Sequence, residues 1–332
     1  MTRAAVVCWA LGVVAATTGH VAGGQATAGQ APGGPQRYAL VVAGAAGGEA
    51  YAAKLTTWRQ ALVSVLREKL AFDAERVEVF AGEGADAQPA TRERISAALE
   101  RLARETGPQD LVMIVLLGHG SFDGVEAKFN LVGPDLDTNE WRDLLRPLRA
   151  RVLFVNTTGA SMPFLERLSG PRRIIVTATE TPAQKFDTIF AEHFIGSLTD
   201  PAADLDKDGR ISVLEAFSAA SRRVKQQYER GGQLPIERAM LDDNGDRVGK
   251  WAGGEGTDGT TAARTFLDGA EAATPADPAL AELLQRQAVL QVQVDDLRAR
   301  KVLMAPDEYA KEFERAMIDL ARVSREIRRK KS

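Results

Sequence analysis

The chain has 332 residues, of which 45% are hydrophobic, and its 42 basic and 45 acidic residues give a formal net charge of -3. This length and apolar content suit one full-sized globular domain with a smaller addition, and they exclude a fibrous or wholly disordered chain. The near balance of charge excludes a global basic field, so we expect no nucleic-acid partner.

The first residues have the pattern of a secretory signal peptide. Arg3 precedes an apolar run from Ala4 to Ala16, and small residues follow between Ala22 and Ala26. The run is shorter than the roughly 20 residues of a membrane-spanning helix, and no later segment has the length and apolarity to span. We therefore expect residues 1–26 to be removed and the protein to be exported, either to the periplasm or out of the cell.

The single cysteine, Cys8, lies inside that apolar run, without the small preceding residue that a lipid-attachment site needs. The mature chain should then hold no cysteine, which excludes disulfides, zinc thiolate sites and a cysteine nucleophile. Residues 27–36 are rich in Gly, Ala, Gln and Pro, a composition that cannot bury a core, and we interpret them as a flexible lead-in.

Apolar runs alternate with helical patterns across residues 37–252, which we interpret as one domain. We expect strands at 38–44, 76–82, 110–118, 128–133, 150–156 and 172–179, and helices at 51–70, 90–105, 137–148, 163–170 and 186–198. Thr91 and Thr138 are the expected N-caps of two helices. Continuously apolar strands separated by helices predict an α/β three-layer sandwich with a mostly parallel sheet, which binds ligands at the carboxyl ends of its strands.

The composition changes near Gly253. Residues 253–276 are rich in Gly, Ala, Thr and Pro and lack periodicity, so we interpret them as a linker. In residues 277–332, apolar residues recur at three- and four-residue steps among charges, with a break near Pro306. This pattern predicts a C-terminal α-helical hairpin or coiled coil that serves self-association or docking.

One apolar run ends in a histidine between two glycines. The stretch from Asp110 to Gly124 reads DLVMIVLLGHGSFDG, which places His119 at the carboxyl end of a central strand. Gly118 and Gly120 permit unusual backbone angles and close approach of another segment. A titratable group at that edge is a candidate catalytic residue, and the alternative is an incidental histidine at a strand end.

The next strand ends in a cluster of small and hydroxyl residues, in the stretch LFVNTTGASM. Together with LLGHGSFDG, this pattern resembles the caspase and legumain group of cysteine peptidases over roughly residues 38–250. In that group a histidine from a Gly-His-Gly-like turn and a cysteine at the end of the following strand form a catalytic dyad. The resemblance makes His119 the family's histidine, and the shared Ser161 and Met162 place Thr157 at the position of the cysteine.

Threonine at that position changes the expected chemistry. A thiolate is a good nucleophile near neutral pH, whereas a threonine hydroxyl must lose its proton during attack and is hindered by its β-branch. We therefore expect a degenerate, non-hydrolytic site that holds a peptide or protein segment. The alternative is a hydrolase in which His119 activates Thr157, Thr158 or Ser161, and it requires an orienting residue that the sequence does not identify, since Asp123 and Glu126 are only close in the chain.

The stretch DLDKDGRISVLE, residues 204–215, matches the calcium-loop template of EF-hands at every defined position. The expected ligands are the side chains of Asp204, Asp206 and Asp208, the carbonyl of Arg210, Ser212 through a water, and Glu215 in bidentate fashion. Gly209 allows the sharp turn. The alternative is an acidic loop that caps the helix beginning near Ser212.

A second acidic stretch, LDDNGDRVG, has Asp242, Asn244 and Asp246 at the first three ligand positions but lacks the glycine and glutamate of the template. We interpret it first as a turn, and the alternative is that it lends a carboxylate to a metal. The sequence thus predicts an exported, caspase-like pseudo-peptidase that binds calcium and a peptide or protein partner. A further alternative is a calcium-stabilised scaffold that acts through its C-terminal helices.

Overall fold

The computed structural model describes residues 35–82, 87–269 and 304–331, with scattered helical residues between 279 and 301. The expected signal peptide, the lead-in up to residue 34 and Cys8 lie outside the described residues. None of the described helices combines the length and apolarity needed to cross a membrane.

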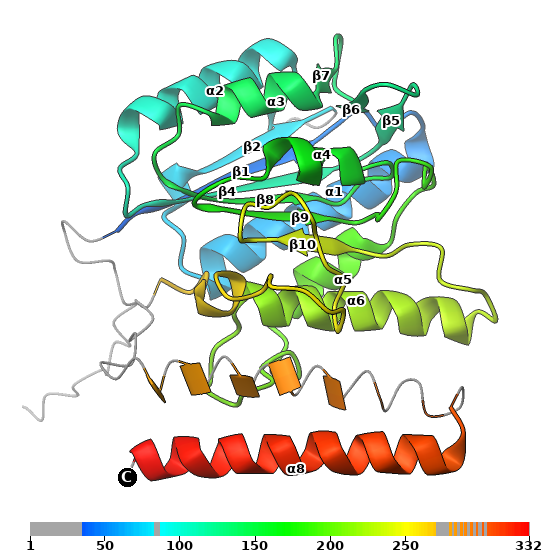
Figure 1. Cartoon of the computed structure of the whole chain (residues 1–332). Coiled ribbons are helices and arrows are strands. Elements are labelled where there is room, and N and C mark those ends of the chain that lie inside the picture. Colours follow the sequence, from blue (N-terminus) through cyan, green and yellow to red (C-terminus); the bar gives the residue numbers. More distant parts are fainter. Residues whose placement is uncertain are drawn as a thin grey trace, which may run out of the picture.

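A seven-stranded sheet in the order β10-β9-β8-β4-β1-β2-β3 forms the centre of the domain (Figure 1). Its strands are β1 Arg37–Ala43, β2 Val77–Ala81, β3 Gln88–Pro89, β4 Leu111–Leu117, β8 Arg151–Asn156, β9 Arg173–Thr177 and β10 Met240–Asp242. All neighbouring pairs are parallel except β10 with β9. The strands β5 Gly120–Phe122, β6 Ala127–Phe129 and β7 Leu136–Asp137 form a separate three-stranded sheet beyond β4.

Helices cover both faces of the large sheet, which confirms the predicted α/β three-layer architecture (Figure 1). One face packs against α1 Glu49–Ser64, which continues as a π-helical turn at Val65–Lys69, and against α5 Phe190–Ser197 and α6 Val213–Arg230. The other face packs against α2 Arg92–Glu105, α3 Thr138–Leu145 and α4 Met162–Leu168. Short 3-10 turns lie at Ala74–Arg76 and Ala262–Arg264.

The buried strand β4 explains why the sequence shows a continuous apolar run rather than an alternating one. Alternate side chains of a strand point to opposite faces, and here both faces are covered. Met113 and Val115 belong to the core on the α1 side, whereas Ile114 and Leu116 belong to the core on the α2 side. A strand at the centre of the sheet therefore has no position left for a polar side chain.

The predicted N-cap Thr91 is present, and its side chain accepts a hydrogen bond from the Arg94 N–H at the start of α2. The prediction that Thr138 is the N-cap of α3 is wrong, because the preceding residue, Asp137, caps this helix. The Asp137 carboxylate accepts from the backbone of Glu140, and the Glu140 side chain accepts from the backbone of Asp137. This reciprocal capping box satisfies two backbone donors at once.

Residues 253–269 do not form the linker that their composition suggests. Ala262 and Leu267 are buried in the core on the α1 side. A β-bridge joins Phe266 to Ser212, and the Val213 N–H donates to the carbonyl of Thr265. The segment thus packs against the start of α6, and the remaining predicted linker residues, 270–276, lie outside the described residues.

The C-terminal helix α8 spans Pro306–Lys331 and begins at the predicted break. Described residues before it, among them Val294 and Leu297, are buried with Ala316 in a small separate cluster that Phe313 and Leu320 extend. The Gln287 side chain also donates a hydrogen bond of 2.9 Å to the hydroxyl of Ser324. These contacts lie between two antiparallel stretches of helix, in agreement with a hairpin (Figure 1).

Candidate functional site

His119 follows β4 at the carboxyl edge of the sheet. Its Nδ1 lies 3.0 Å from Oδ1 of Asp187, and its Nε2 lies 2.9 Å from the carbonyl oxygen of Ala46. Its ring stacks on Tyr51 with the two centroids 4.1 Å apart. Both ring nitrogens are therefore occupied by contacts with Ala46 and Asp187, and neither is hydrogen-bonded to a serine or threonine hydroxyl of the described residues.

Asp187 is the carboxylate that contacts the histidine, and sequence reasoning missed it. It lies in the loop between β9 and α5, far from His119 in the chain, and its side chain is 54% exposed. The two carboxylates close to His119 in the sequence have other partners. Asp123 accepts the backbone N–H groups of Val125 and Glu126, and Glu126 accepts the hydroxyl of Thr138.

Tyr51 completes the surroundings of the imidazole. Its hydroxyl donates a hydrogen bond of 3.2 Å to the carbonyl of Gly118, the residue before His119. Burial raises the pKa of Tyr51, and the nearby carboxylates of Asp187 and Glu237 raise it further. The phenol therefore stays a hydrogen-bond donor that fixes the backbone at the end of β4.

Thr157 follows β8, the parallel neighbour of β4. Its side-chain hydroxyl donates to the carbonyl of Leu116 at 2.7 Å, and its own carbonyl accepts the hydroxyl of Thr188. Thr157 is only 2% exposed. The structure thus brings the two predicted dyad positions to neighbouring strand ends, but the threonine hydroxyl bonds to the β4 backbone and not to the His119 ring.

The other two candidate hydroxyls are also engaged. Thr158 Oγ1 lies 2.8 Å from Oδ1 of Asn156. Ser161 Oγ accepts the backbone N–H groups of Ala178 and Thr179 at 3.1 and 3.2 Å. Both residues are fully buried. These hydroxyls hold the turn after β8 against the end of β9, and neither is exposed to a substrate.

The loop between β9 and α5 covers that turn. The Ala160 N–H donates to the carbonyl of Gln184 at 2.6 Å, and a Cβ added at Gly159 would lie 2.7 Å from the carbonyl oxygen of Phe186. A Cβ at Gly120 would approach the opposite side of the turn, 2.3 Å from the carbonyl oxygen of Gly159. The turn that would carry a nucleophile is therefore enclosed between two segments.

This packing explains the second glycine of the Gly-His-Gly triplet and gives a direct test. Gly120→Ala is expected to destabilise the fold by about 1–3 kcal/mol, because the new methyl group overlaps backbone that cannot rotate away. Urea unfolding followed by circular dichroism measures the change. Gly48→Ala is the matched control, since no atom lies within 4 Å of its added Cβ. Equal stability of the two variants would contradict the close approach.

The predicted calcium loop brings three carboxylates together. Ligand atoms of Asp204, Asp206 and Asp208 lie within 4.8 Å of one another, and Gly209 adopts the left-handed φ of +88° that the template requires. The Gly209 N–H donates to Asp204 at 3.1 Å, and the Arg210 N–H donates to Asp208 at 2.8 Å. The loop is folded around its carboxylates.

Burial and mutual repulsion act on the carboxylates of this cluster. Burial raises the pKa of Asp206 to about 7, and the carboxylates of Glu215 and Asp208 contribute to that rise. One buried oxygen of Asp204 has no hydrogen-bond partner among the described residues. Oxygen ligands in such a group suit a hard divalent cation, and the three carboxylates fit calcium.

Ser212 and Glu215, the last two predicted ligands, are hydrogen-bonded to each other. Glu215 Oε2 accepts the backbone N–H and the hydroxyl of Ser212, each at 2.8 Å, which forms the capping box of α6. Its Oε1 accepts the Leu205 N–H at 2.8 Å. The Arg210 side chain pairs with Asp268 and stacks on Phe266 at 3.8 Å, so it attaches the loop to residues 265–269.

The second acidic stretch is a turn, as its sequence suggests. The Asp242 carboxylate accepts the backbone N–H groups of Gly245 and Arg247 at 2.9 and 2.8 Å. Asp242 and Asp246 also lie close to Asp258, which comes from another part of the chain. Burial raises the pKa of Asp258 to about 6, and its Oδ1 accepts the N–H of Asp243. These carboxylates organise two turns.

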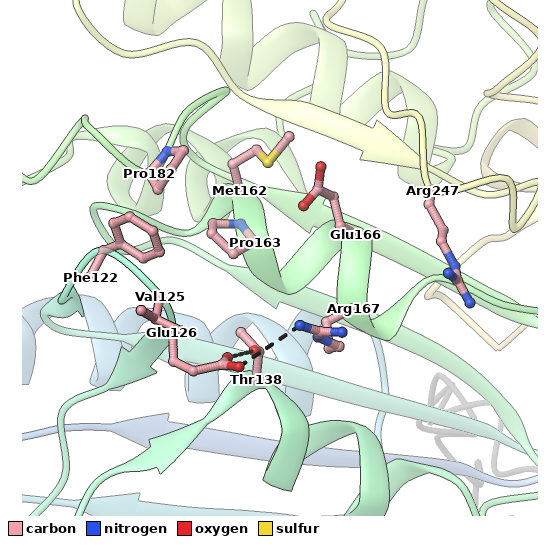
Figure 2. A pocket seen from close by; sticks show the side chains of 10 residues that line it. All are labelled: Phe122, Val125, Glu126, Thr138, Met162, Pro163, Glu166, Arg167, Pro182 and Arg247. Atoms are coloured by element: carbon pink, nitrogen blue, oxygen red, sulfur yellow. Dashed lines mark hydrogen bonds and ion pairs between the residues drawn. The ribbon is translucent and has the colours of Figure 1, made fainter.

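A pocket of about 510 Å³ lies beside the site, between the small sheet and α4 (Figure 2). Phe122, Met162 and Pro163 form an apolar side, and charged residues form the other. Within it Glu126 lies 3.8 Å from Arg167. The pocket joins segments that are distant in the sequence, so no local pattern could have predicted it.

Three solved structures resemble this chain at low sequence identity. No family model and no curated protein matches the sequence. Protein GSU0716 from Geobacter sulfurreducens is 15% identical over 63% of this chain and 93% of its own, with a TM-score of 0.43. Raptor from Chaetomium thermophilum is 14% identical over 58% of this chain and 18% of its own, with a TM-score of 0.36. A secreted C11 cysteine protease from Bacteroides thetaiotaomicron is 11% identical over 63% of this chain and 67% of its own, with a TM-score of 0.38.

Proposed function

We propose that this protein is an exported, caspase-like pseudo-peptidase that binds a peptide or protein segment and calcium without cutting the peptide. The observation that carries the proposal is the hydrogen bonding at the two dyad positions. Each ring nitrogen of His119 contacts an acceptor, and the Thr157 hydroxyl contacts the Leu116 carbonyl. General-base catalysis needs a free ring nitrogen close to the nucleophile's proton, and this arrangement lacks it.

The pocket beside the site supports a peptide as the ligand. Phe122 follows His119 by three residues, and the pocket combines apolar walls with the charges of Glu166, Arg167 and Arg247 (Figure 2). Recognition sites of this kind bury apolar side chains and use a few polar groups for orientation. The proposed ligand is therefore a segment with an apolar side chain between charged neighbours.

Cleavage assays test the non-catalytic part of the proposal. The purified protein and His119→Ala, incubated with a broad peptide library with and without calcium, are expected to give the same product spectrum as a peptide-only blank. Thr157→Ala and Ser161→Ala serve as further comparisons. Cleavage by the wild type that disappears in His119→Ala would overturn the pseudo-peptidase assignment.

Binding assays test the peptide part separately. Peptides retained from the same library should bind with at least about tenfold lower affinity when Phe122→Ala and Met162→Ala are combined, because two apolar contacts of about 1 kcal/mol or more are lost. Val132→Ala is the control, since Val132 is a partly exposed apolar residue outside the pocket. Equal affinities for both variants would exclude this pocket as the peptide site.

A hydrolase remains the second candidate because of one observation, the contact of 3.0 Å between Asp187 and His119. Such a carboxylate orients the histidine in serine hydrolases. This function would require the His119 ring to leave Ala46 and a buried hydroxyl to turn toward it. The cleavage assay above distinguishes the two candidates.

The scaffold alternative depends on the C-terminal helices. Met317 and Ile318 are partly exposed apolar residues on α8, which favours contact with a second apolar surface. If the helices mediate self-association, light scattering should give an oligomer for the wild type and a monomer for Ile318→Glu. Equal masses for the two proteins would exclude a contact through this part of α8.

A further inference from the structure

A second cavity lies at the opposite edge of the sheet from His119, before the first residues of β8 and β9, and it has a volume of about 520 Å³. Five of its eleven lining residues are arginines and none is acidic. The arginines are Arg142, Arg146, Arg149, Arg172 and Arg173. The other lining residues are apolar or small, so no lining residue carries a negative charge that could balance the arginines.

Nearby carboxylates neutralise little of this charge. Asp143 lies outside the lining and contacts two of the arginines, at 3.2 Å from Arg142 and 3.7 Å from Arg146. Arg172 and Arg173 donate instead to the backbone carbonyls of Pro108 and Leu168, which carry no charge. Among the ion pairs of the described residues, none involves Arg149, Arg172 or Arg173. Three of the five lining arginines therefore have no ion pair with a carboxylate of the described residues.

Two properties of the arginines on the β9 side are energetically unfavourable in themselves. Burial lowers the pKa of Arg173, which shows that its charge is poorly solvated. Arg172 adopts a left-handed φ of +64°, a conformation that is strained for a residue with a Cβ and natural for glycine. Local strain of this kind is common at ligand-binding positions.

We propose that this arginine cavity binds a small ligand that carries phosphate or a similar multivalent oxyanion group. Guanidinium groups bind the oxygens of such groups through paired N–H donors, and a bound anion would supply the missing counter-charge. The volume lies within the range of small-molecule sites, roughly 300–1,000 Å³. The apolar wall between the arginines would contact the uncharged part of the ligand. This proposal is independent of the peptide site at the other edge.

Calorimetric titration of the purified protein with inorganic pyrophosphate tests the proposal, in a buffer of about 0.15 M ionic strength that screens diffuse surface attraction. We expect saturable binding with one site per chain. The double variant Arg146→Gln with Arg149→Gln should bind at least about tenfold more weakly, because two charge-assisted contacts are lost. Both positions are exposed, so the substitutions leave the core intact.

Lys311→Gln with Arg315→Gln on α8 is the matched control, since it removes the same charge from exposed positions outside the cavity. Its affinity for pyrophosphate should equal that of the wild type. No saturable binding by the wild type would overturn the proposal, and so would equal weakening in both double variants.

A phospholipid headgroup is the other source of the same chemistry. If pyrophosphate displaces the protein from phosphatidylglycerol vesicles, the cavity is supported as the site for both the free phosphate and the lipid headgroup. If the protein stays on the vesicles in the presence of pyrophosphate, lipid is bound elsewhere, and this result would count against the cavity as the headgroup site.

Discussion

Calcium is expected to raise the midpoint of thermal unfolding by roughly 5–10 °C when its concentration is about a hundred times its dissociation constant. A ligand at that excess stabilises the folded state by about 2.7 kcal/mol, and each kcal/mol shifts a domain of this size by roughly 2–4 °C. The physical cause is the cluster of Asp204, Asp206 and Asp208, in which burial and neighbouring carboxylates raise the pKa of Asp206 to about 7. A bound cation would remove that repulsion.

Conservative variants separate ion binding from folding of the loop. Asp204→Asn and Asp208→Asn keep an oxygen that accepts the N–H groups of Gly209 and Arg210, while each removes a negative charge. The combined variant should fold and lose the calcium shift. Asp246→Asn, in the other acidic turn, is the control and should keep it. A calcium shift that survives in the double variant would contradict the proposed site.

Glu215 has two possible roles in this loop, and they exclude each other in part. Without an ion it caps α6 through the backbone N–H and hydroxyl of Ser212, whereas the sequence template assigns it two bonds to calcium. Glu215→Gln keeps one acceptor for the cap, but its NH2 group then faces backbone N–H donors that the second carboxylate oxygen accepts in the wild type. Its calcium affinity should fall, and its stability without calcium should fall by about 1–3 kcal/mol, the usual cost of a buried donor that loses its acceptor.

The sequence predicts the strands of the sheet well but not the residues that contact His119, and the difference has a physical reason. A strand buried on both faces, such as β4, needs apolar residues at every position, and this requirement is visible in a single run of residues. The position of His119 follows, because the run ends there. The partners of His119 do not follow, since Ala46 and Asp187 are brought to the ring by loops that are distant in the sequence.

The error over residues 253–269 has the same origin. The segment has no helical or strand periodicity, so its composition resembles that of a linker. It is held by individual contacts, such as Arg210 with Asp268 and the Asp243 carboxylate with the N–H groups of Gly259 and Ala262. Contacts of this kind depend on single side chains and leave no repeating pattern in the sequence.

The acidic loop was recognisable in the sequence because its carboxylates come from the twelve consecutive residues 204–215, and its binding of calcium stays a prediction. The arginine cavity was not recognisable, because its five arginines come from α3, the turn before β8, the turn before β9 and the first residue of β9. Arginines in those segments have the pattern of ordinary surface charges. Only the parallel pairing of β8 with β9 brings the two turns to the same edge of the sheet.

Glu237 is expected to make the protein less stable as the pH rises from about 5 to 8, and Glu237→Gln should remove its own part of that dependence. Asp206 and Asp258, whose pKa values burial also raises, contribute in the same pH range. The Glu237 side chain is 6% exposed, and burial raises its pKa to about 7 even though it accepts the Ile189 N–H and the Tyr228 hydroxyl. An unfolded glutamate has a pKa of about 4.3. Between about pH 4.3 and 7, the folded state therefore keeps a proton on Glu237 that the unfolded state has lost.

The sign of the effect follows from this proton. The stability that comes from the raised pKa of Glu237 is fully present below about pH 4.3 and is lost as the pH rises toward and through 7. The free energy of unfolding falls by no more than about 1.4 kcal/mol per pH unit for this one group. Urea unfolding at several pH values should give a falling free energy of unfolding for the wild type and a flatter curve for Glu237→Gln. Glu229→Gln, an exposed position on α6, is the control and should keep the wild-type slope. Parallel curves for wild type and Glu237→Gln would show that the buried carboxyl is not the titrating group. Because Glu237 holds the backbone of Ile189 two residues after Asp187, the flatter curve would also locate the pH sensitivity beside the His119 contact.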